Sequence, residues 1–511
     1  MMRDRCGVLT AVFLLAGGLL PAPWQARAAA EPLTIDSEKQ LFLDDRVIES
    51  STNVERVMNP PYQPLEPVLI ANAPWELAEH AHVWNSATVR KEDGKIRLWY
   101  HLLTLREEAR ETGPVAKGEY VAYAESEDGI HFVKPELGLH EFGGTTANSI
   151  VIPNCRGVAA WLDPQAPPEA RYRTQTKGPQ GRLTFHHSPD GIHWELTRAI
   201  DIGDCDTQSM AFWDETLGRY VLYTRKWVRF ENKSHSYRYH RRMESNDLEH
   251  WDNEVQVLGA DEADLATYET SAGQPPVDYY GACVFRYPDS RGMYVMVGHA
   301  LWHWFAREPL QSLGPDQLDD RLCAGRDGKE FARLGGRLPF LRPGPGGTWF
   351  SRHVWTSSAP IEMGNELWLY YWGSNMDHAG NIDPAARGEI RCGLGRAILR
   401  LDGFVSLDAG YAWGEFTTPP LIFAGDSLAL NVDTGAGGVA FVEILDAEGA
   451  AIEGFSRAEA VPACGNDVAL RAKWTGAAAL GALGGKPVRL RFSMRDCKLY
   501  AFQFMDSAES R

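Results

Sequence analysis

Residues 126–132 read SEDGIHF, and residues 188–194 read SPDGIHW. This pattern of Ser-x-Asp-Gly-Ile-His-aromatic returns in looser form at residues 245–251 (SNDLEHW) and 325–331 (GRDGKEF), and a shortened copy, LDGF, lies at residues 401–404. The copies are roughly 60 to 80 residues apart, and such a regular period indicates a structural repeat.

A turn followed by an aromatic-rich strand precedes each copy of the pattern. These segments lie at residues 94–100, 170–176, 218–224, 292–298 and 364–371. Asp-Gly pairs supply the positive φ angles of tight hairpin turns, and alternating β-branched and aromatic residues are typical of strands. Each unit therefore holds about four strands, and five units predict a five-bladed β-propeller. The expected blades are roughly residues 80–135, 145–197, 204–255, 275–335 and 352–409.

The polar residues of the repeated turns have a structural interpretation. A carboxylate at a fixed turn position accepts hydrogen bonds from nearby backbone N–H groups. We therefore expect the turn aspartates to be structural, and the histidines that share their register to be packing residues. They are Asp128, Asp190, Asp247 and Asp327, and His131, His193 and His250.

Composition places the chain among globular proteins and excludes some partners. Of its 511 residues, 44% are hydrophobic and 23% are charged, which excludes wholesale disorder. The formal net charge of −17 argues against a nucleic acid or an anionic membrane as partner. The chain also holds 17 Trp, 18 Tyr and 20 Phe, and most of these belong to the repeat.

The first thirty residues have the features of a secretory signal peptide. Arg3 and Arg5 precede an apolar run at residues 7–20, and residues 26–30 (ARAAA) fit the small-x-small cleavage rule. The run is too short for a membrane span, so we expect a secreted or periplasmic protein. The rest of the chain keeps seven cysteines, mostly expected as small buried side chains, with Cys464 and Cys497 the best candidates for a disulfide if one forms.

The character of the sequence changes after residue 410. The segment 427–504 alternates short strands and turns, as in a β-sandwich. We therefore expect an all-β chain with a propeller at residues 31–412, including an N-terminal strand near residues 40–50, and a sandwich at residues 413–511.

Several short motifs carry a family resemblance. Residues 245–251 resemble the S-x-D-L-x-H-W motif of the five-bladed glycoside hydrolases of families 32, 43 and 68, and residues 428–433 (LALNVD) resemble the sandwich of family 32. The chain as a whole resembles a group of secreted bacterial proteins described as family 32 N-terminal-like, through residues 42–45 (FLDD), 206–208 (DTQ) and 401–406 (LDGFVS). The resemblance implies a propeller followed by a sandwich, and an activity on carbohydrates.

The same families imply where catalytic acids would stand. They place three acids at the axial ends of the innermost strands of blades 1 to 3, because hydrolysis needs one carboxyl group to protonate the leaving oxygen and another to attack the sugar or activate water. Residues 82–87 (HVWNSA) match the blade 1 motif but lack its Asp-Pro, so Glu79 is the substitute. Asp163 keeps the blade 2 Asp-Pro, and residues 203–208 (GDCDTQ) keep an acid next to Cys in blade 3.

Position in the repeat adds two candidates. Asp206 is expected to open the inner strand of blade 3, and Asp278 that of blade 4, so both would converge on the axis. Converging carboxylates raise one another's pKa, which suits an acid and base pair. The catalytic candidates are therefore Asp206, Asp278, Glu79 and Asp163, each with a structural turn or strand-end role as the alternative.

Candidate substrate-binding residues complete the expected site. Indole rings can stack on sugar faces, and polar groups can hold hydroxyl groups. These candidates are Trp84, Asn85, Arg225, Trp302 with Trp304, His353 and Asp377. Blade packing is the alternative role for Trp302 and Trp304, and a surface ion pair is the alternative for Arg225.

Three functions fit these observations. The first is a secreted glycoside hydrolase that cleaves a poly- or oligosaccharide by carboxylate acid and base catalysis. The second is a non-catalytic carbohydrate-binding propeller that has lost the blade 1 aspartate. The third, a phosphorylase of the family 130 type, needs abundant phosphate, which export disfavours. We expect no cofactor and no metal in catalysis, although family 43 suggests a structural Ca²⁺ in the central channel.

Overall fold

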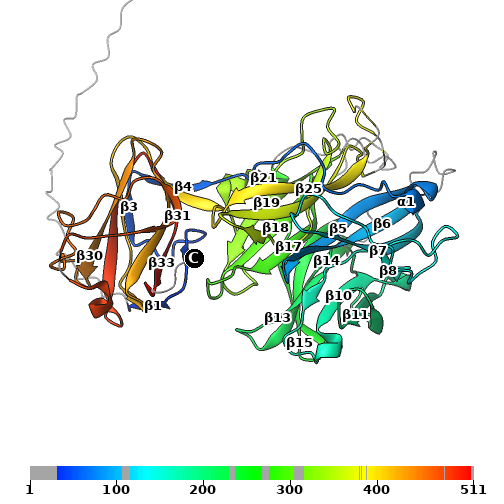
Figure 1. The fold of residues 1–511 in the computed structure, drawn as a ribbon, viewed down its shortest axis with the longest axis horizontal. Coiled ribbons are helices and arrows are strands. Elements are labelled where there is room, and N and C mark those ends of the chain that lie inside the picture. Colours follow the sequence, from blue (N-terminus) through cyan, green and yellow to red (C-terminus); the bar gives the residue numbers. More distant parts are fainter. Residues whose placement is uncertain are drawn as a thin grey trace, which may run out of the picture.

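The computed structural model describes residues 31–105, 116–206, 208–229, 236–266, 276–303, 316–378, 380, 382–386, 388, 390–476 and 478–507. These residues are almost entirely β-strands and loops, and their α-helices are two short ones, α1 (Pro74–Ala78) and α2 (Glu262–Leu265). Figure 1 shows two lobes, a larger one that contains β5 to β25 and a smaller one that contains the C-terminal strands. The expected signal peptide and Trp304 lie outside the described residues.

Three four-stranded antiparallel sheets follow one another along the chain in the larger lobe. The first consists of β5 (Ala81–Glu92), β6 (Lys95–Leu105), β7 (Ala116–Ser126) and β8 (Ile150–Pro153). The second consists of β9 (Trp161–Leu162), β10 (Tyr172–Lys177), β11 (Leu183–Ser188) and β12 (Glu195–Ile200). The third consists of β13 (Met210–Asp214), β14 (Arg219–Arg229), β15 (Ser236–Ser245) and β16 (Trp251–Leu258).

The expected fourth and fifth units belong to one nine-stranded sheet. Its strands are β17 (Val277–Arg286), β18 (Tyr294–Trp302), β19 (Gln317–Gly325), β20 (Ala332–Arg333), β21 (Pro339–Leu341), β22 (His353–Thr356), β23 (Ile361–Met363), β24 (Glu366–Ser374) and β25 (Cys392–Arg400). The two halves meet where β19 and β22 run parallel, with Leu318 opposite His353.

The repeated turns have the structure that their aspartates predict. Asp128 Oδ1 accepts hydrogen bonds of 2.8 Å from the backbone N–H groups of Ile130 and His131. Asp190, Asp247 and Asp327 accept the same pair of bonds in their own turns. The structural role of the four aspartates is therefore confirmed.

The prediction that the turn histidines are packing residues is wrong. The side chain of His131 is 83% exposed, and its Nδ1 lies 2.7 Å from Asp128 Oδ2. His193 and His250 are also exposed and contact Asp190 and Asp247 in the same way. The rings close the turn from its solvent side instead of filling the space between sheets.

Aromatic side chains hold three of the repeated turns against a different sheet. The carbonyl oxygen of the turn glycine accepts a hydrogen bond in three copies: Gly191 from Trp99 Nε1 (2.6 Å), Gly328 from Tyr223 Oη (2.7 Å) and Gly129 from Tyr370 Oη (2.8 Å). Gly129 has a φ of +73°, and a Cβ there would lie 2.6 Å from Tyr370 Oη, so only glycine fits. Because Tyr370 belongs to β24, the last strands of the larger lobe contact the first sheet.

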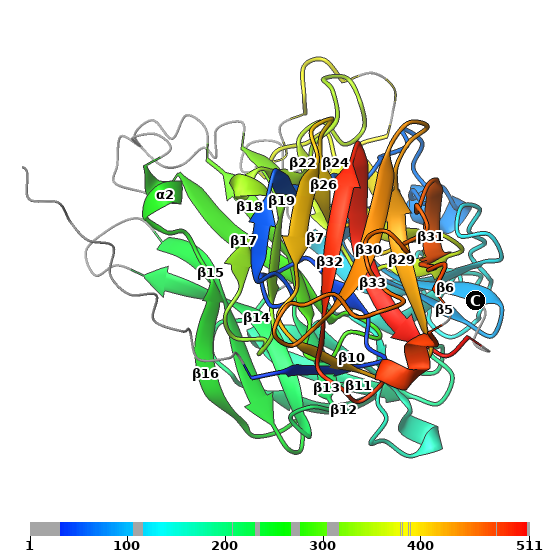
Figure 2. The same cartoon turned by 90° about the vertical axis from the view of Figure 1, so that its left-hand side faces the viewer.

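The smaller lobe consists of two six-stranded sheets, and it includes the N-terminal strands. One sheet contains β1 (Leu33–Asp36), β3 (Ser50–Thr52), β27 (Gly414–Thr417), β28 (Leu421–Phe423), β30 (Val439–Asp446) and β32 (Val488–Arg495). The other contains β2 (Gln40–Leu41), β4 (Val54–Met58), β26 (Val405–Ala409), β29 (Ser427–Asp433), β31 (Asn466–Arg471) and β33 (Cys497–Met505). Figure 2 shows this lobe from the front, with β30 beside β32.

Several strand pairings in this lobe differ from the grouping that the sequence suggested. Strands β1, β2 and β3, grouped there with residues 31–412, pair with β28, β33 and β27 of the C-terminal part. Strand β26, expected in the fifth blade, pairs with β4 and β33. Stacked rings fill the space between the sheets, including Phe423 of β28 with Phe504 of β33 at 3.8 Å.

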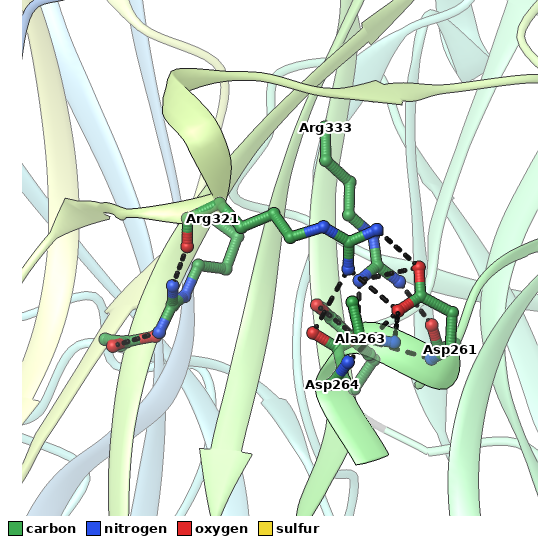
Figure 3. Close-up of polar contacts among 9 residues, drawn as sticks. Asp261, Ala263, Asp264, Arg321 and Arg333 are labelled. Atoms are coloured by element: carbon green, nitrogen blue, oxygen red, sulfur yellow. Dashed lines mark hydrogen bonds and ion pairs between the residues drawn. The ribbon is translucent and has the colours of Figure 1, made fainter. Parts of the chain in front are cut away.

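An ion-pair cluster secures the outer part of the nine-stranded sheet (Figure 3). Arg333 on β20 pairs with Asp264 of α2 and with Asp261, which caps that helix. Arg337 pairs with the same two aspartates, and its carbonyl accepts from Arg321 on β19. These contacts attach the segment of α2 to β19 and β20.

The cysteines and the hydropathy complete the description of the fold. All seven cysteines of the described residues are free thiols, so Cys464 and Cys497 form no disulfide in this structure. Cys464 is exposed, and the other six are buried. Across the described segments, no helix has the length and apolar composition needed to cross a membrane.

Candidate functional site

A cavity of about 240 Å³ lies where several sheets of the larger lobe meet. Its walls come from β5, β6 and β7, from the loops after β8 and before β13, from β17, β18, β19, β22 and β24, and from the loop after β24. The lining residues are Trp84, Asn85, Leu103, Glu119, Arg156, Asp206, Tyr280, Leu301, Leu318, His353, Trp355, Trp372, Ser374, Asp377 and His378. A larger groove of about 820 Å³ near Trp213 and Arg291 contains none of the predicted site residues, so we place the site in the smaller cavity.

The cavity brings together five of the residues that the sequence singled out. They are Trp84, Asn85, Asp206, His353 and Asp377, and they come from four separate stretches of the chain. Asn85, His353 and Asp377 are each less than 10% exposed. These side chains therefore lie on the walls of an enclosed site.

Tryptophan rings form one wall of the cavity. The rings of Trp84 and Trp372 lie 5.2 Å apart, and Trp372 Nε1 donates a 2.9 Å hydrogen bond to the carbonyl of Val83. The bond joins β24 to β5 and fixes the orientation of the Trp372 ring. Such a fixed indole surface suits the apolar face of a sugar ring.

A buried polar network supports a third tryptophan, Trp355. The His299 ring stacks on Trp355 at 4.2 Å, and His299 Nδ1 lies 2.6 Å from Asp320 Oδ1. Asp320 Oδ2 accepts from both the backbone and the hydroxyl of Thr356, and Trp355 Nε1 donates to Gln208. Because these groups are bonded and buried, the Trp355 ring is held in one position.

Two carboxylates of the cavity wall share one arginine. Arg156 Nε donates a 2.7 Å hydrogen bond to Glu119 Oε1, and Arg156 Nη1 lies 3.6 Å from Asp206 Oδ1. The two nitrogens belong to one planar guanidinium, so these carboxylate oxygens are at most about 9 Å apart. Separations of about 5 to 9.5 Å between two carboxyl groups are those that glycoside hydrolysis uses.

Asp206 has a second set of cations on its other side. Lys177 Nζ lies 3.0 Å and Arg225 Nη2 lies 2.5 Å from Asp206 Oδ2. Burial lowers the pKa of Arg225, but Asp206 and Tyr280 outweigh this effect and raise it overall. Arg225 therefore lies behind Asp206 and does not line the cavity.

His353 and His378 line the cavity near Asp377, and both contact the buried carboxylate of Asp316. Asp316 Oδ1 accepts from the backbone N–H of His378 and lies 3.3 Å from His353 Nε2. Burial raises the pKa of Asp316, but the bonds from His353 and His378 outweigh burial and lower it overall. Burial, with Arg238, lowers the pKa of His378 to about 3, so this ring is neutral where its Nε2 meets Tyr280 Oη at 2.9 Å.

Two of the predicted catalytic residues lie outside the cavity with their carboxylates occupied. Asp163 is 3% exposed and accepts hydrogen bonds from Arg173, from Tyr220 and from the backbone of Gln165. Asp278 is 2% exposed and accepts from the backbone and the guanidinium of Arg238. Both side chains hold strands together in this structure.

The other predicted residues outside the cavity are Glu79 and Trp302. Glu79 ends α1 and lies against the turn at Gly143. Arg321 covers the ring of Trp302 at 5.3 Å, and Trp302 Nε1 donates to Asp319. Burial raises the pKa of Asp319 to about 6 against the influence of Arg321, but Asp319 does not line the cavity.

Several lining residues were not singled out from the sequence. The most important are Glu119, Arg156, Trp355 and Trp372. Trp355 and Trp372 belong to the aromatic pattern of the repeat, which indicates packing equally well. Glu119 is the acid nearest to the start of β7, and no local motif distinguishes it from Glu125 on the same strand.

Side chains that commonly bind metals are dispersed in the part of the chain that the structure describes. No group of three or more His, Cys, Asp or Glu side chains there is arranged to hold a metal ion. The structural Ca²⁺ suggested by family 43 stays a prediction.

Comparisons with known proteins identify similar structures at low sequence identity. No family model and no curated protein matches the chain. A complex of BT0996 with RGII is 13% identical, with 67% of this protein and 92% of that one covered, and a TM-score of 0.45. A β-1,2-mannobiose phosphorylase from Listeria innocua is 14% identical, covering 68% and 97%, with a TM-score of 0.42. A glycosyl hydrolase from Bacteroides ovatus is 13% identical, covering 67% and 94%, with a TM-score of 0.40. The similar structures thus include a glycosyl hydrolase and a phosphorylase.

Proposed function

We propose that this protein is a glycosidase, and that it hydrolyses a glycosidic bond in the cavity lined by Trp84, Glu119 and Asp206. The observation that carries the proposal is the Glu119–Arg156–Asp206 arrangement in an aromatic-walled cavity. Glu119 of this arrangement and Asp377 are two carboxyl groups on the wall of one cavity, beside ring faces that can hold a sugar, and hydrolysis needs two such groups.

The proposal includes a five-bladed propeller as the frame of the site. Its support is the order of the sheets and the contact of the last strands with the first sheet, through Tyr370 with Gly129 and Trp372 with Val83. In this arrangement the two halves of the nine-stranded sheet are blades 4 and 5. The cavity then lies at the axis, where the blades converge.

Each carboxyl group has a proposed part in the reaction. Glu119 and Asp206 are both ion-paired to Arg156. Glu119 therefore attacks the sugar or activates water, while Asp206, backed by Lys177 and Arg225, holds Arg156 in place. Asp377, the third carboxyl group of the wall, protonates the leaving oxygen.

The size of the cavity limits the part of the substrate that it can enclose. A volume of about 240 Å³ is below the roughly 300–1,000 Å³ of pockets that enclose drug-sized ligands. We infer that one terminal sugar enters the cavity while the rest of the substrate stays outside.

We also propose that the protein acts after export, on the basis of the signal-like residues 1–30.

One observation favours the alternative, a carbohydrate-binding propeller without catalysis. Ser86 stands where the family 32 motif places its nucleophilic aspartate, and Ser86 Oγ donates to the carbonyl of Val158 in a fully buried position. No acid replaces this aspartate on β5 near Ser86, since the strand continues as Ala87-Thr88.

The test is release of sugar from a broad oligosaccharide panel by the purified protein. Hydrolysis that disappears in Glu119→Gln and Asp377→Asn, but persists in Glu125→Gln, would support the proposal. Binding of oligosaccharides without release would support the non-catalytic alternative. Equal release by all four proteins would place the reaction elsewhere in the molecule.

A further inference from the structure

The smaller lobe carries an alternating series of aromatic and arginine side chains on its surface. Arg495 lies 5.4 Å from the ring centres of both Tyr411 and Trp413. Arg457 lies 5.7 Å from the ring centre of Trp413 and 3.2 Å from that of Phe441. The order is therefore Tyr411, Arg495, Trp413, Arg457 and Phe441, and we call this set the aromatic–arginine ladder.

The ladder joins four segments of the smaller lobe, and Arg457 comes from the one between β30 and β31 (Asn466–Arg471). Tyr411 and Trp413 lie between β26 and β27, Phe441 belongs to β30, and Arg495 ends β32. Strands β30 and β32 are paired, and Figure 2 shows them side by side. The ladder is thus a preformed surface feature and not one flexible loop.

The two guanidinium groups of the ladder have unused donors. Neither Arg457 nor Arg495 makes a side-chain hydrogen bond or an ion pair with another described residue, and Arg495 Nε is buried without a partner. Two other arginines of β32 differ, since Arg489 pairs with Glu49 and Arg491 pairs with Glu443. The ladder arginines therefore retain their charge and most of their hydrogen-bonding capacity for a ligand.

The aromatic rings of the ladder are accessible as well. Tyr411 is 83% exposed and Trp413 is 46% exposed, which are large values for aromatic side chains. Two stacked cations hold the Trp413 ring, so a ligand would meet it in a fixed orientation.

We propose that the aromatic–arginine ladder binds an acidic polysaccharide, at a site separate from the cavity of the larger lobe. Exposed rings accept the apolar faces of sugars, and free guanidinium groups bind sulfate or carboxylate groups with paired hydrogen bonds. The chain as a whole has a net charge of −17, so it repels polyanions except where cations are locally unpaired. The charge pattern therefore favours an acidic over a neutral glycan at this surface.

The experiment is electrophoresis of the full protein through native gels that contain either dextran sulfate or uncharged dextran. We expect dextran sulfate to retard the protein and dextran to leave it unaffected. The double variant Arg457→Gln/Arg495→Gln should bind dextran sulfate about tenfold more weakly, as should Tyr411→Ala, while Tyr411→Phe keeps the ring and the affinity. Arg491→Gln is the matched control, because this arginine lies on the same strand but is already paired.

The outcomes separate a ligand site from a structural role. Unchanged thermal stability together with lost retardation in Tyr411→Ala would support the site, because this exposed side chain contributes little to folding. Equal retardation of the wild type and the double variant, an equal loss in Arg491→Gln, or stronger binding to anionic lipid vesicles than to dextran sulfate would overturn it. Glu119→Gln must be retarded like the wild type, so failure of the proposed hydrolysis would leave this test intact.

Discussion

Arg156 donates a 2.7 Å hydrogen bond from Nε to Glu119 Oε1, and this bond links two sheets. Glu119 belongs to β7 of the first sheet, whereas the backbone of Arg156 exchanges two hydrogen bonds with Lys177 at the end of β10 in the second. The same guanidinium reaches Asp206, which precedes the third sheet. The candidate site is therefore assembled by one arginine that three successive sheets hold in place.

Replacing Glu119 tests the proposed attacking carboxylate. Glu119→Gln keeps a hydrogen-bond acceptor for Arg156 but removes the charge, so we expect kcat to fall at least about 100-fold with little change in KM. Steady-state kinetics on the preferred oligosaccharide measures this split. Glu125→Gln on the same strand should retain full activity, because Glu125 pairs with Lys95 and accepts from Tyr123 outside the cavity. An active Glu119→Gln enzyme would contradict the assignment.

Replacing Trp84 tests whether the tryptophan rings of the cavity wall stack on the sugar. Trp84→Ala removes the ring that packs 5.2 Å from Trp372, and we expect KM to rise about tenfold because one stacking surface is lost. Trp302→Ala serves as the control, because the Trp302 ring lies outside the cavity beneath Arg321. A larger rise in KM in Trp302→Ala than in Trp84→Ala would mean that the sugar stacks outside the cavity.

The buried pair of Asp278 and Arg238 predicts a loss of stability. Burial opposes the Asp278 carboxylate, but Arg238 and His303 outweigh burial and lower its pKa. Asp278→Asn leaves Arg238 buried without a counter-charge, so the free energy of unfolding should fall by about 3 kcal/mol in urea titrations at pH 7. Asp252→Asn, which removes an exposed partner of Arg219, should cost less than about 1 kcal/mol.

The sign of the pH dependence of the Asp278 effect follows from the lowered pKa. The stabilisation is present above the unfolded-state pKa of about 3.9 and is lost as the pH falls through the lower folded-state value. The difference between wild type and Asp278→Asn should therefore shrink in acid. If the difference in free energy of unfolding between wild type and Asp278→Asn stays constant from pH 7 to pH 3, the charge of Asp278 does not contribute to stability.

The buried His240 predicts a second loss of stability in acid, which begins at a higher pH than the loss from Asp278. Burial, with His299 and Arg225 nearby, lowers the pKa of His240 from 6.5 to about 3. The unfolded chain binds a proton below about pH 6.5 while folded His240 stays neutral, so stability falls from there toward pH 3. The slope for this residue is at most about 1.4 kcal/mol per pH unit.

The variant His240→Leu isolates this contribution. Both ring nitrogens of His240 are buried without a hydrogen-bond partner among the described residues, so leucine breaks no bond of the side chain. Urea unfolding at pH 7, 6, 5 and 4 should give a shallower slope for His240→Leu than for the wild type. Parallel curves would mean that His240 is protonated in the folded protein.

Short-range features of the fold could be predicted from the sequence. The bonds of Asp128 to Ile130 and His131 involve residues within three positions, so the turn chemistry is contained in the motif itself. The pairing of β1 with β28 involves residues nearly 400 positions apart, and no local pattern specifies it. The outward position of His131 was missed for a similar reason, because burial depends on which sheet faces the turn.

The residues of the candidate site also fall into those that the sequence could predict and those that depend on the packing of distant segments. Residue type and repeat position alone determined that acids and tryptophans would gather near strand ends, and Trp84, Asp206 and Asp377 do lie together on the cavity wall. Only the tertiary structure decided between chemically identical groups: Asp278 lies behind Arg238, whereas Glu119 meets Arg156 at the cavity. The physical reason is that sequence determines which groups are available, while exposure and ionic partners depend on how separate sheets pack together.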